Sequence, residues 1–296
     1  MIGSCVIVVA RFAFAVGVLA LAAGTPVRAQ PAKIFVASTG SDSSDGSRTA
    51  PKRSFQAAHD AVAPGGNVVV LDTAGYGTLT ISKSVAVTVP PGVNGFVTAS
   101  SGTNGLLIAA GVADKVSLRG LVIESTGAAG DGVGVLVSKA AFILLEDCAI
   151  RGFGTGVRVF ASGNGANVIM RGGSVRDVAT GVKVAAASSF AASQATISDV
   201  LIDGASAVGV HAEGFPNSNA LGSVTLIRTT ISNSAIGVET SRNGVVTVDG
   251  SALISNGLAF NKVSNAGTIL TRSNNTLDRN TATINGGNTL TPLDAF

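Results

Sequence analysis

The chain has 296 residues, of which 38 are Gly and 12% are charged, and it contains no Trp. Its periodic apolar positions and low net charge exclude a disordered chain, and its many Gly, Ala, Ser, Thr, Val and Asn residues favour short strands over long helices. No Lys/Arg run and no basic stripe interleaved with aromatic residues occurs, so no nucleic-acid partner is predicted.

Residues 1–29 are predicted to be a bacterial-type signal peptide. Arg11 precedes an apolar run, residues 12–23, that is too short to span a bilayer. We predict cleavage after Ala29, a secreted or periplasmic protein and no membrane span in the mature chain; the alternative is an uncleaved N-terminal anchor. Cleavage leaves 18 basic and 17 acidic side chains and a lone Cys148, which is expected to point inward without forming a disulfide.

Residues 30–66 are expected to cap the N-terminal end of the structure that follows. A short helix is predicted from Phe55 to Val62, with Ser54 as its N-cap. Its apolar side would cover bare core and unpaired backbone groups. The loop before this helix contains Asp42 and Asp45, whose carboxylates could bind a hard cation but fit a solvated turn better.

A ladder of near-repeats dominates the next segment, residues 67–285. Each clear repeat contains a Gly followed by alternating apolar residues, as in Gly156-Val157-Arg158-Val159. A second apolar position recurs at intervals of 23 to 29 residues, at Ile123, Ile150, Val175, Ile202, Ile231, Ile254 and Leu277. Turns that contain Asn233 and Asn256 follow two of these positions, and their amides are expected to hydrogen-bond between coils.

Each interval contains three short strands joined by Gly, Asn or Ser, which is typical of one turn of a solenoid. Stacking the coils about 4.8 Å apart pairs the backbone groups and buries the apolar positions, and parallel crossovers are right-handed. We therefore predict an all-β fold, a right-handed single-stranded parallel β-helix with three faces, followed by a C-terminal tail at 286–296. The alternative, an antiparallel barrel or sandwich, would require even strands and hairpin turns.

The cap and the repeats resemble a known superfamily. The segment 34–42 with its Ala-Ser-Thr-Gly-Ser-Asp end, the later Phe55-Gln56-Ala57-Ala58 and Pro64-Gly65-Gly66, and the repeated Gly-Val-x-Val resemble right-handed parallel β-helix proteins of the pectate-lyase-like group, which have the pectin lyase fold. The resemblance covers about residues 34–285. It implies the fold but no activity, because this fold hosts lyases, hydrolases, epimerases, adhesins and scaffolds.

Positions that carry catalysis in related hydrolases are not matched. In polygalacturonases, catalytic aspartates precede the Gly of the Gly-Ile strand. The corresponding residues here are Thr155, Thr180, Val208 and Ile236, and only Asp131 lies nearby. A single carboxylate does not make an acid/base pair, so the resemblance does not imply a glycoside hydrolase.

The outward residues of the Gly-Val strands predict a candidate binding site. Arg158, Lys183, His211 and Glu239, preceded by Leu136, are expected to stand on successive coils about 5 Å apart. Arg158 and Lys183 could contact an anionic sugar chain, and His211 could accept a proton. The alternative is a solvated sheet whose outward positions are charged without a binding role.

These observations predict an exported β-helix protein without a recognisable catalytic site. It would be a structural or binding module for an acidic polysaccharide or a cell-surface glycan, and its oligomeric state is left open. The alternative is a polysaccharide lyase that acts on uronate-containing polymers; calcium is considered only in that case, because Asp199 and Asp203 lie on another face. A third alternative, the passenger of a larger adhesin, requires a membrane anchor. With Tyr76 as the only Tyr, no aromatic platform for neutral sugars is expected.

Overall fold

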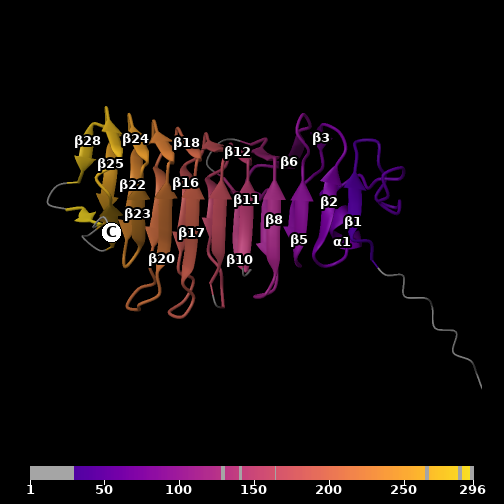
Figure 1. Cartoon of the computed structure of the whole chain (residues 1–296), viewed down its shortest axis with the longest axis horizontal. Coiled ribbons are helices and arrows are strands. Elements are labelled where there is room, and N and C mark those ends of the chain that lie inside the picture. The colour runs from indigo at the N-terminus through magenta and orange to yellow at the C-terminus, as the bar shows by residue number, and fades with distance from the viewer. Residues whose placement is uncertain are drawn as a thin grey trace, which may run out of the picture.

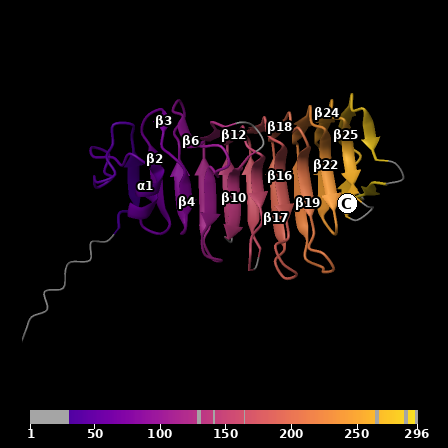
Figure 2. The same cartoon turned by 180° about the vertical axis from the view of Figure 1, so that it is seen from behind.

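The alternating apolar residues of the repeats form three parallel sheets along a solenoid. This is a computed structural model, and it describes residues 30–127, 131–139, 142–163, 165–263, 267–285 and 289–293. From β2 onward, each strand pairs with the strand three places later in the chain, so the strands of one sheet lie side by side along the molecule (Figures 1 and 2). The predicted three-faced parallel β-helix is confirmed. The predicted signal peptide lies outside the described residues.

The three sheets differ in which part of each coil they collect. Sheet A contains β1 (Lys33–Val36), β2 (Gly66–Val70), β5 (Val85–Thr88), β8 (Lys115–Arg119), β11 (Phe142–Glu146), β14 (Asn167–Arg171), β17 (Ser193–Ser198), β20 (Gly222–Ile227), β23 (Val245–Asp249), β26 (Thr268–Thr271) and β29 (Thr291–Pro292). Sheet B contains β3 (Ala74–Gly75), β6 (Gly95–Ala99), β9 (Leu121–Ser125), β12 (Ala149–Arg151), β15 (Ser174–Arg176), β18 (Leu201–Asp203), β21 (Thr230–Ser232), β24 (Ala252–Ile254) and β27 (Thr276–Asp278). Sheet C contains β4 (Leu79–Ile81), β7 (Leu106–Ala109), β10 (Val133–Lys139), β13 (Thr155–Val159), β16 (Thr180–Ala185), β19 (Val208–Glu213), β22 (Ile236–Ser241), β25 (Leu258–Lys262) and β28 (Ala282–Ile284).

The apolar ladder of sheet B stacks as predicted over most of its length. Ile150 pairs with Ile123 on one side and with Val175 on the other. The prediction is wrong by one residue further on, because Ile231 pairs with Leu253 and not with Ile254. Leu253 is completely buried, whereas Ile254 is half-buried and lies on the outer face. Strand parity allows only one of two adjacent apolar residues to face the core.

The glycine at the second position of β10, β13, β16, β19 and β22 is required by close packing between coils. A Cβ on Gly209 would lie 2.5 Å from Ile231 Cγ2 and 2.6 Å from the carbonyl oxygen of Gly237 in the next coil. Gly134 faces Ile150 and Gly156 in the same way, both at 2.6 Å. At this position the coils are therefore in backbone contact, and any side chain would push them apart.

An asparagine ladder crosses the last coils, but only one of the two predicted asparagines belongs to it. Asn256 is buried, and its side-chain amide bonds Asn280 Oδ1 and the Ile231 carbonyl, both at 3.0 Å. Asn233 follows the buried Ile231 by two residues, whereas Asn256 follows the buried Leu253 by three. Asn233 adopts φ 51°, and its side-chain amide donates to the Asp203 carboxylate outside the core. The side chain of Asn256 therefore links the preceding coil, through Ser234 and Ile231, to Asn280 in the following coil.

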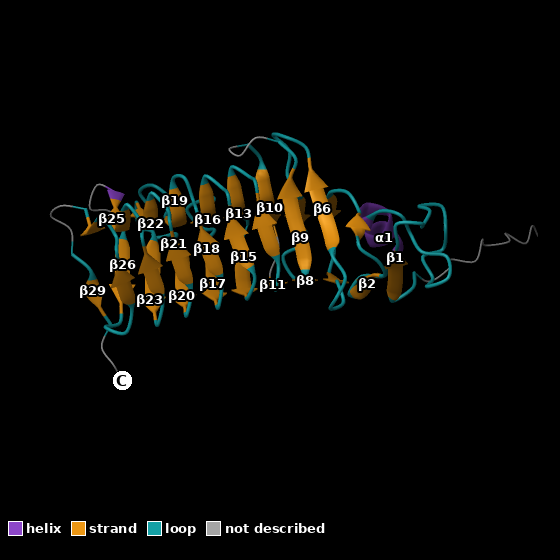
Figure 3. Cartoon of the chain, turned by 90° about the horizontal axis from the view of Figure 1, so that it is seen from above, coloured by secondary structure: helices purple, strands orange, loops and turns teal. Residues whose placement is uncertain are grey.

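A helix covers the N-terminal end of the solenoid (Figure 3). The helix α1 (Phe55–Ala61) has the predicted Ser54 N-cap and ends one residue earlier than predicted. The buried Tyr76 ring lies 5.0 Å from the Phe55 ring, so the single Tyr is a core residue of the cap. Asp42 accepts hydrogen bonds from the backbone of Arg53 and Ser54, which gives this carboxylate a structural role.

Two further predictions about single segments can be compared with the structure. Cys148 is buried, as expected, and burial raises the pKa of its thiol to about 11. The strand β29 lies within the predicted tail and pairs with β26, and β1 lies within the predicted cap and pairs with β2. Among the described residues, no helix is both long enough and apolar enough to cross a bilayer.

Candidate functional site

The predicted outward residues form a continuous column on sheet C, which faces the viewer in Figure 2. Arg158, Lys183, His211, Glu239 and Asn261 are consecutive Cα partners on β13, β16, β19, β22 and β25. We call these five residues the polar column. The predicted register of the first four is confirmed, while their role in binding stays a prediction.

Local strand geometry explains why these polar side chains face outward. The residues on either side of the first four, such as Val157 and Val159 around Arg158, are completely buried; Asn261 follows the buried Phe260. Successive side chains on a strand point to opposite faces, so the residue between two core valines must point outward. The outward direction of Arg158, Lys183, His211 and Glu239 is thus a direct consequence of the repeated Gly-Val-x pattern.

A second row beside the column was missed by the sequence analysis. Lys183 Nζ lies 2.9 Å from Glu213 Oε2, and the Arg242 guanidinium pairs with the other oxygen of the same carboxylate. Burial favours the neutral acid, but the hydrogen bond from Lys183 and the charges of Lys183 and Arg242 lower the pKa of Glu213 overall. Lys183, expected as a cationic contact, is therefore already paired with an anion. Glu213 follows His211 by two residues, so strand parity could have placed it on this face.

His211 is held in the middle of the site. Its Nε2 lies 2.9 Å from Ser241 Oγ and 3.7 Å from Glu239 Oε1. Burial, followed by the positive charge of Lys183, lowers the pKa of His211 below its ordinary value, so the imidazole is neutral at neutral pH. Both partners contact the same nitrogen, unlike a nucleophile triad, in which the acid holds Nδ1 and the serine contacts Nε2.

Two carboxylates therefore flank His211. Glu239 accepts a hydrogen bond of 2.7 Å from Asn261 Nδ2, and Glu213 bridges Lys183 and Arg242. The hydrogen bond from Lys183 and the charges of Lys183 and Arg242 keep the pKa of Glu213 below its ordinary value. Hydrolysis of a glycosidic bond requires one carboxyl group that stays protonated as the acid, and the lowered pKa of Glu213 does not suit that role.

Arg158 differs from the other cations of the site. Its guanidinium carbon lies 5.3 Å from the centre of the Phe160 ring. Its Nε is buried and has no hydrogen-bond partner among the described residues, and no carboxylate in that part of the chain pairs with it. Phe160 is the second feature that the sequence analysis missed, because contact with Arg158 depends on the path of the chain after β13.

The other carboxylates that were considered have structural partners. Asp199 pairs with Arg228 at 2.8 Å, and Asp203 accepts hydrogen bonds from Ser232 and Asn233. Neither lies on the outer face of sheet C. Within the described ranges, no group of three or more His, Cys, Asp or Glu residues could hold a metal ion.

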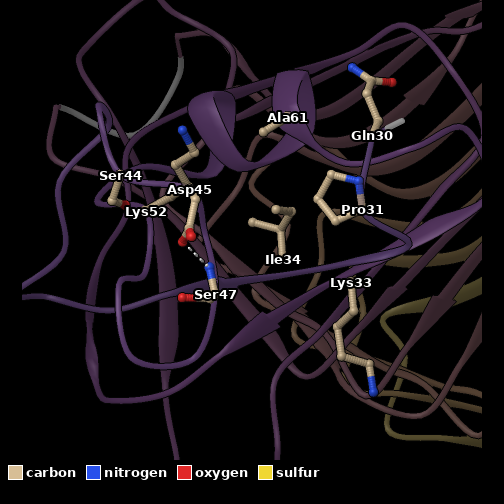
Figure 4. Close-up of a pocket in the computed structure, with 9 residues that line it drawn as sticks. All are labelled: Gln30, Pro31, Lys33, Ile34, Ser44, Asp45, Ser47, Lys52 and Ala61. Carbon is tan, nitrogen blue, oxygen red and sulfur yellow. Dashed lines mark hydrogen bonds between the residues drawn. The ribbon is translucent and has the colours of Figure 1, made fainter. Parts of the chain in front are cut away.

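A hollow of about 440 Å³ lies at the N-terminal end, several coils away from the polar column. Figure 4 shows it between α1, Pro31 and the loop that contains Asp45. Asp45 accepts a hydrogen bond from the backbone of Ser47, and Lys52 bonds the carbonyl of Asp42. Its charged groups therefore hold the cap loop together.

Comparison with known proteins places the fold but not the activity. Neither a protein-family model nor a curated protein matches the sequence. The solved structure of pectate lyase Pel9A is similar with a TM-score of 0.62 and 14% identity, over 88% of this chain and 79% of that chain. The lacto-N-biosidase of Eubacterium ramulus, assigned to GH136, gives a TM-score of 0.49 and 10% identity over 88% and 68%. At 14% identity, the similarity to pectate lyase Pel9A shows a shared fold and no shared activity. The chain thus has the fold of a right-handed parallel β-helix, the pectin lyase fold, which it shares with pectate lyase Pel9A.

Proposed function

We propose that the chain is an exported binding module for acidic polysaccharides, and that the polar column is its binding surface. The single observation that carries this proposal is Arg158, a half-buried cation without a carboxylate partner among the described residues. Arg binds a carboxylate through two parallel hydrogen bonds in a fixed geometry. A uronate carboxylate or another acidic group of a cell-surface glycan would supply the missing anion.

The electrostatics of the site support weak, extended binding. Arg158, Lys183 and Arg242 stand against Glu213 and Glu239, which leaves one net positive charge when His211 is neutral. Successive coils repeat about every 4.8 Å, so a polymer parallel to the solenoid axis would cross one polar side chain after another. Exposed charges are screened by salt, so the affinity should fall as ionic strength rises.

The proposal is tested by affinity electrophoresis and calorimetry with polygalacturonate, alginate and neutral dextran. Arg158→Gln should weaken binding to an acidic polymer by about 10- to 100-fold, because a charge-assisted hydrogen bond contributes about 1.5–3 kcal/mol. The matched control is Arg151→Gln, the same change on the outer face of sheet B, where Arg151 pairs with Glu124. Equal losses in both variants, or none in either, would refute the assignment of the site.

Export is part of this proposal. The predicted signal peptide, cut after Ala29, would deliver the chain to the periplasm or the medium. Mass spectrometry of the protein recovered from both fractions tests it, with a mature N-terminus at Gln30 as the expected result. An intact N-terminus in the membrane fraction would instead indicate the anchor.

A second candidate, a lyase for uronate polymers, is favoured by one observation. A neutral His211 lies beside Lys183, which would contact a uronate carboxylate by exchanging its partner Glu213 for the substrate. In such an elimination His211 would take the proton from the carbon next to the carboxylate. A carbon–carbon double bond would form as the bond to the leaving oxygen breaks, and that oxygen would receive a proton from water. The ultraviolet absorbance of unsaturated uronides, measured with and without calcium, detects this product. Absorbance that disappears in His211→Asn while binding persists would establish the enzyme.

A further inference from the structure

Exposed apolar side chains gather on one corner of the solenoid. Among the described residues, five large hydrophobic side chains are exposed, and four of them lie on loops that lead from sheet C to sheet A: Val112, Phe160, Phe190 and Val263. We call this edge the C–A corner. The fifth, Leu277, lies on β27 in the last coil. Apolar side chains that share one edge indicate an interaction surface more strongly than scattered ones do.

Phe190 is presented by an anchored turn. Its side chain is 91% exposed, while Ala186 and Ala191 on either side are buried. The Ala191 backbone donates to the Ser188 carbonyl at 3.3 Å, and the Ala186 backbone donates to the Glu213 carbonyl at 3.0 Å. The long loops of this corner extend below the strands in Figure 1. An aromatic ring on an anchored turn loses little conformational freedom on binding, which favours its use as a contact.

Phe160 connects this corner to the polar column. Its ring is 41% exposed and lies beside the Arg158 guanidinium, and its backbone donates to the Val137 carbonyl of the preceding coil at 3.0 Å. Phe190 follows the next sheet C strand, so the two rings belong to consecutive coils. A ligand on Arg158 and Lys183 would have these rings along one side.

We propose that the C–A corner binds the non-polar faces of sugar rings in the same polymer whose acidic groups contact the polar column. This inference rests on the proposed function and narrows it. The ligand is an acidic polysaccharide whose sugar rings contact the C–A corner while its acidic groups contact the polar column. A polyanion without sugar rings would make only the contacts with the polar column. Ligand sites commonly combine aromatic walls with a few fixed polar groups, as Phe160, Phe190 and Arg158 would here.

The composition of the loops favours a glycan over a lipid surface. The loop segments 160–166, 186–192 and 214–221 contain Ala, Ser, Gly, Asn, Phe, Pro and Leu but no Lys or Arg. The shorter loop 242–244 of the same corner contains Arg242, whose charge is paired with Glu213. Segments that insert into a bilayer interface usually add cationic residues that are attracted to anionic lipids. Short hydroxyl and amide side chains beside aromatic rings match the mixed polar and non-polar surface of a sugar.

The test compares two polyanions with a variant that removes both rings. Phe160→Ala combined with Phe190→Ala should reduce affinity for polygalacturonate and alginate by about tenfold and leave affinity for inorganic polyphosphate unchanged. Arg158→Gln should weaken binding to all three. Leu277→Ala is the matched control, since it removes an exposed apolar side chain elsewhere and should change nothing. Circular dichroism establishes that each variant is folded.

Each outcome separates the two proposals. Full polysaccharide binding by the double variant, together with a loss in Arg158→Gln, overturns the role of the corner and leaves the proposed function standing. No effect of Arg158→Gln, or no polysaccharide binding by the wild type, overturns the proposed function itself. Binding of the wild type but not the double variant to phosphatidylcholine/phosphatidylglycerol vesicles would identify the corner as a membrane contact and refute the inference.

Discussion

Replacing Gly209 by Ala should separate two coils at the centre of the candidate site. The added Cβ would lie 2.6 Å from the Gly237 carbonyl oxygen, where ordinary contacts begin at 3.4 Å, so the coils must move apart by about 0.8 Å. The displaced strands are β19 and β22, which carry His211 and Glu239 in register. The same change that strains the core should therefore disturb the polar column.

The size of the effect follows from two opposing contributions. Overpacking a close contact costs about 1–3 kcal/mol, while the reduced freedom of the unfolded chain returns about 0.4–1 kcal/mol. We expect Gly209→Ala to lower the free energy of unfolding by about 1–2 kcal/mol, measured as a lower denaturation midpoint in urea with an unchanged slope. Hydrogen exchange should accelerate first at the amides of β22.

The matched control is Gly75→Ala. A Cβ at Gly75 would meet only Thr98 Oγ1 at 3.7 Å, an ordinary contact, so this variant should be neutral or slightly more stable. The reasoning is refuted if Gly209→Ala has the wild-type midpoint. It is equally refuted if the two glycine variants lose the same stability.

Three further predictions concern buried polar groups. Thr240 and Thr229 are both fully buried, but only Thr229 has carbonyl acceptors for its hydroxyl. Thr240→Val should raise the free energy of unfolding by about 1 kcal/mol and Thr229→Val should lower it similarly; changes of the same sign would contradict this. Asn256→Ala removes three interior side-chain hydrogen bonds and should cost about 2–4 kcal/mol in the same denaturation assay, and a loss below 1 kcal/mol would count against the ladder. Burial lowers the pKa of His211 below its ordinary value, so its contribution to stability is complete above about pH 6.5 and is lost as pH falls through the lowered folded-state pKa. Urea midpoints of His211→Gln should therefore fall less steeply than those of the wild type as pH drops below about 6.5.

The fold could be predicted because the interior of a solenoid repeats in the sequence. Ile123, Ile150 and Val175 occupy one stack, and their spacing is the length of a coil. The error at Ile254 shows where this reasoning ends. Where two apolar residues are adjacent, as Leu253 and Ile254 are, periodicity cannot decide which one faces the core, and a shift of one residue reverses the faces.

Only the part of the candidate site that lies within strands could be predicted from the sequence in the same way. Residues inside strands inherit their direction from the core, so Arg158 and His211 were placed correctly, and Glu213 could have been added by counting two residues on. Arg242 and Phe160 lie just beyond strand ends. Their contacts with Glu213 and Arg158 depend on the path of each turn and on side-chain rotamers, which no sequence period records.

Charged side chains are paired differently on different parts of the solenoid surface. At the corner between sheets A and B, Arg228 pairs with Asp199 and Arg272 pairs with Asp249, so adjacent coils neutralise one another. The outer face of sheet C instead contains Arg158 without such a partner in the described part of the chain, beside exposed Phe160. The core of each coil requires only that Val, Ile and Gly stay in register. The outward residue of each strand can therefore be substituted without altering the packing of the core. A rigid column of this kind suits a long repetitive ligand, because each added coil adds one contact without altering the others.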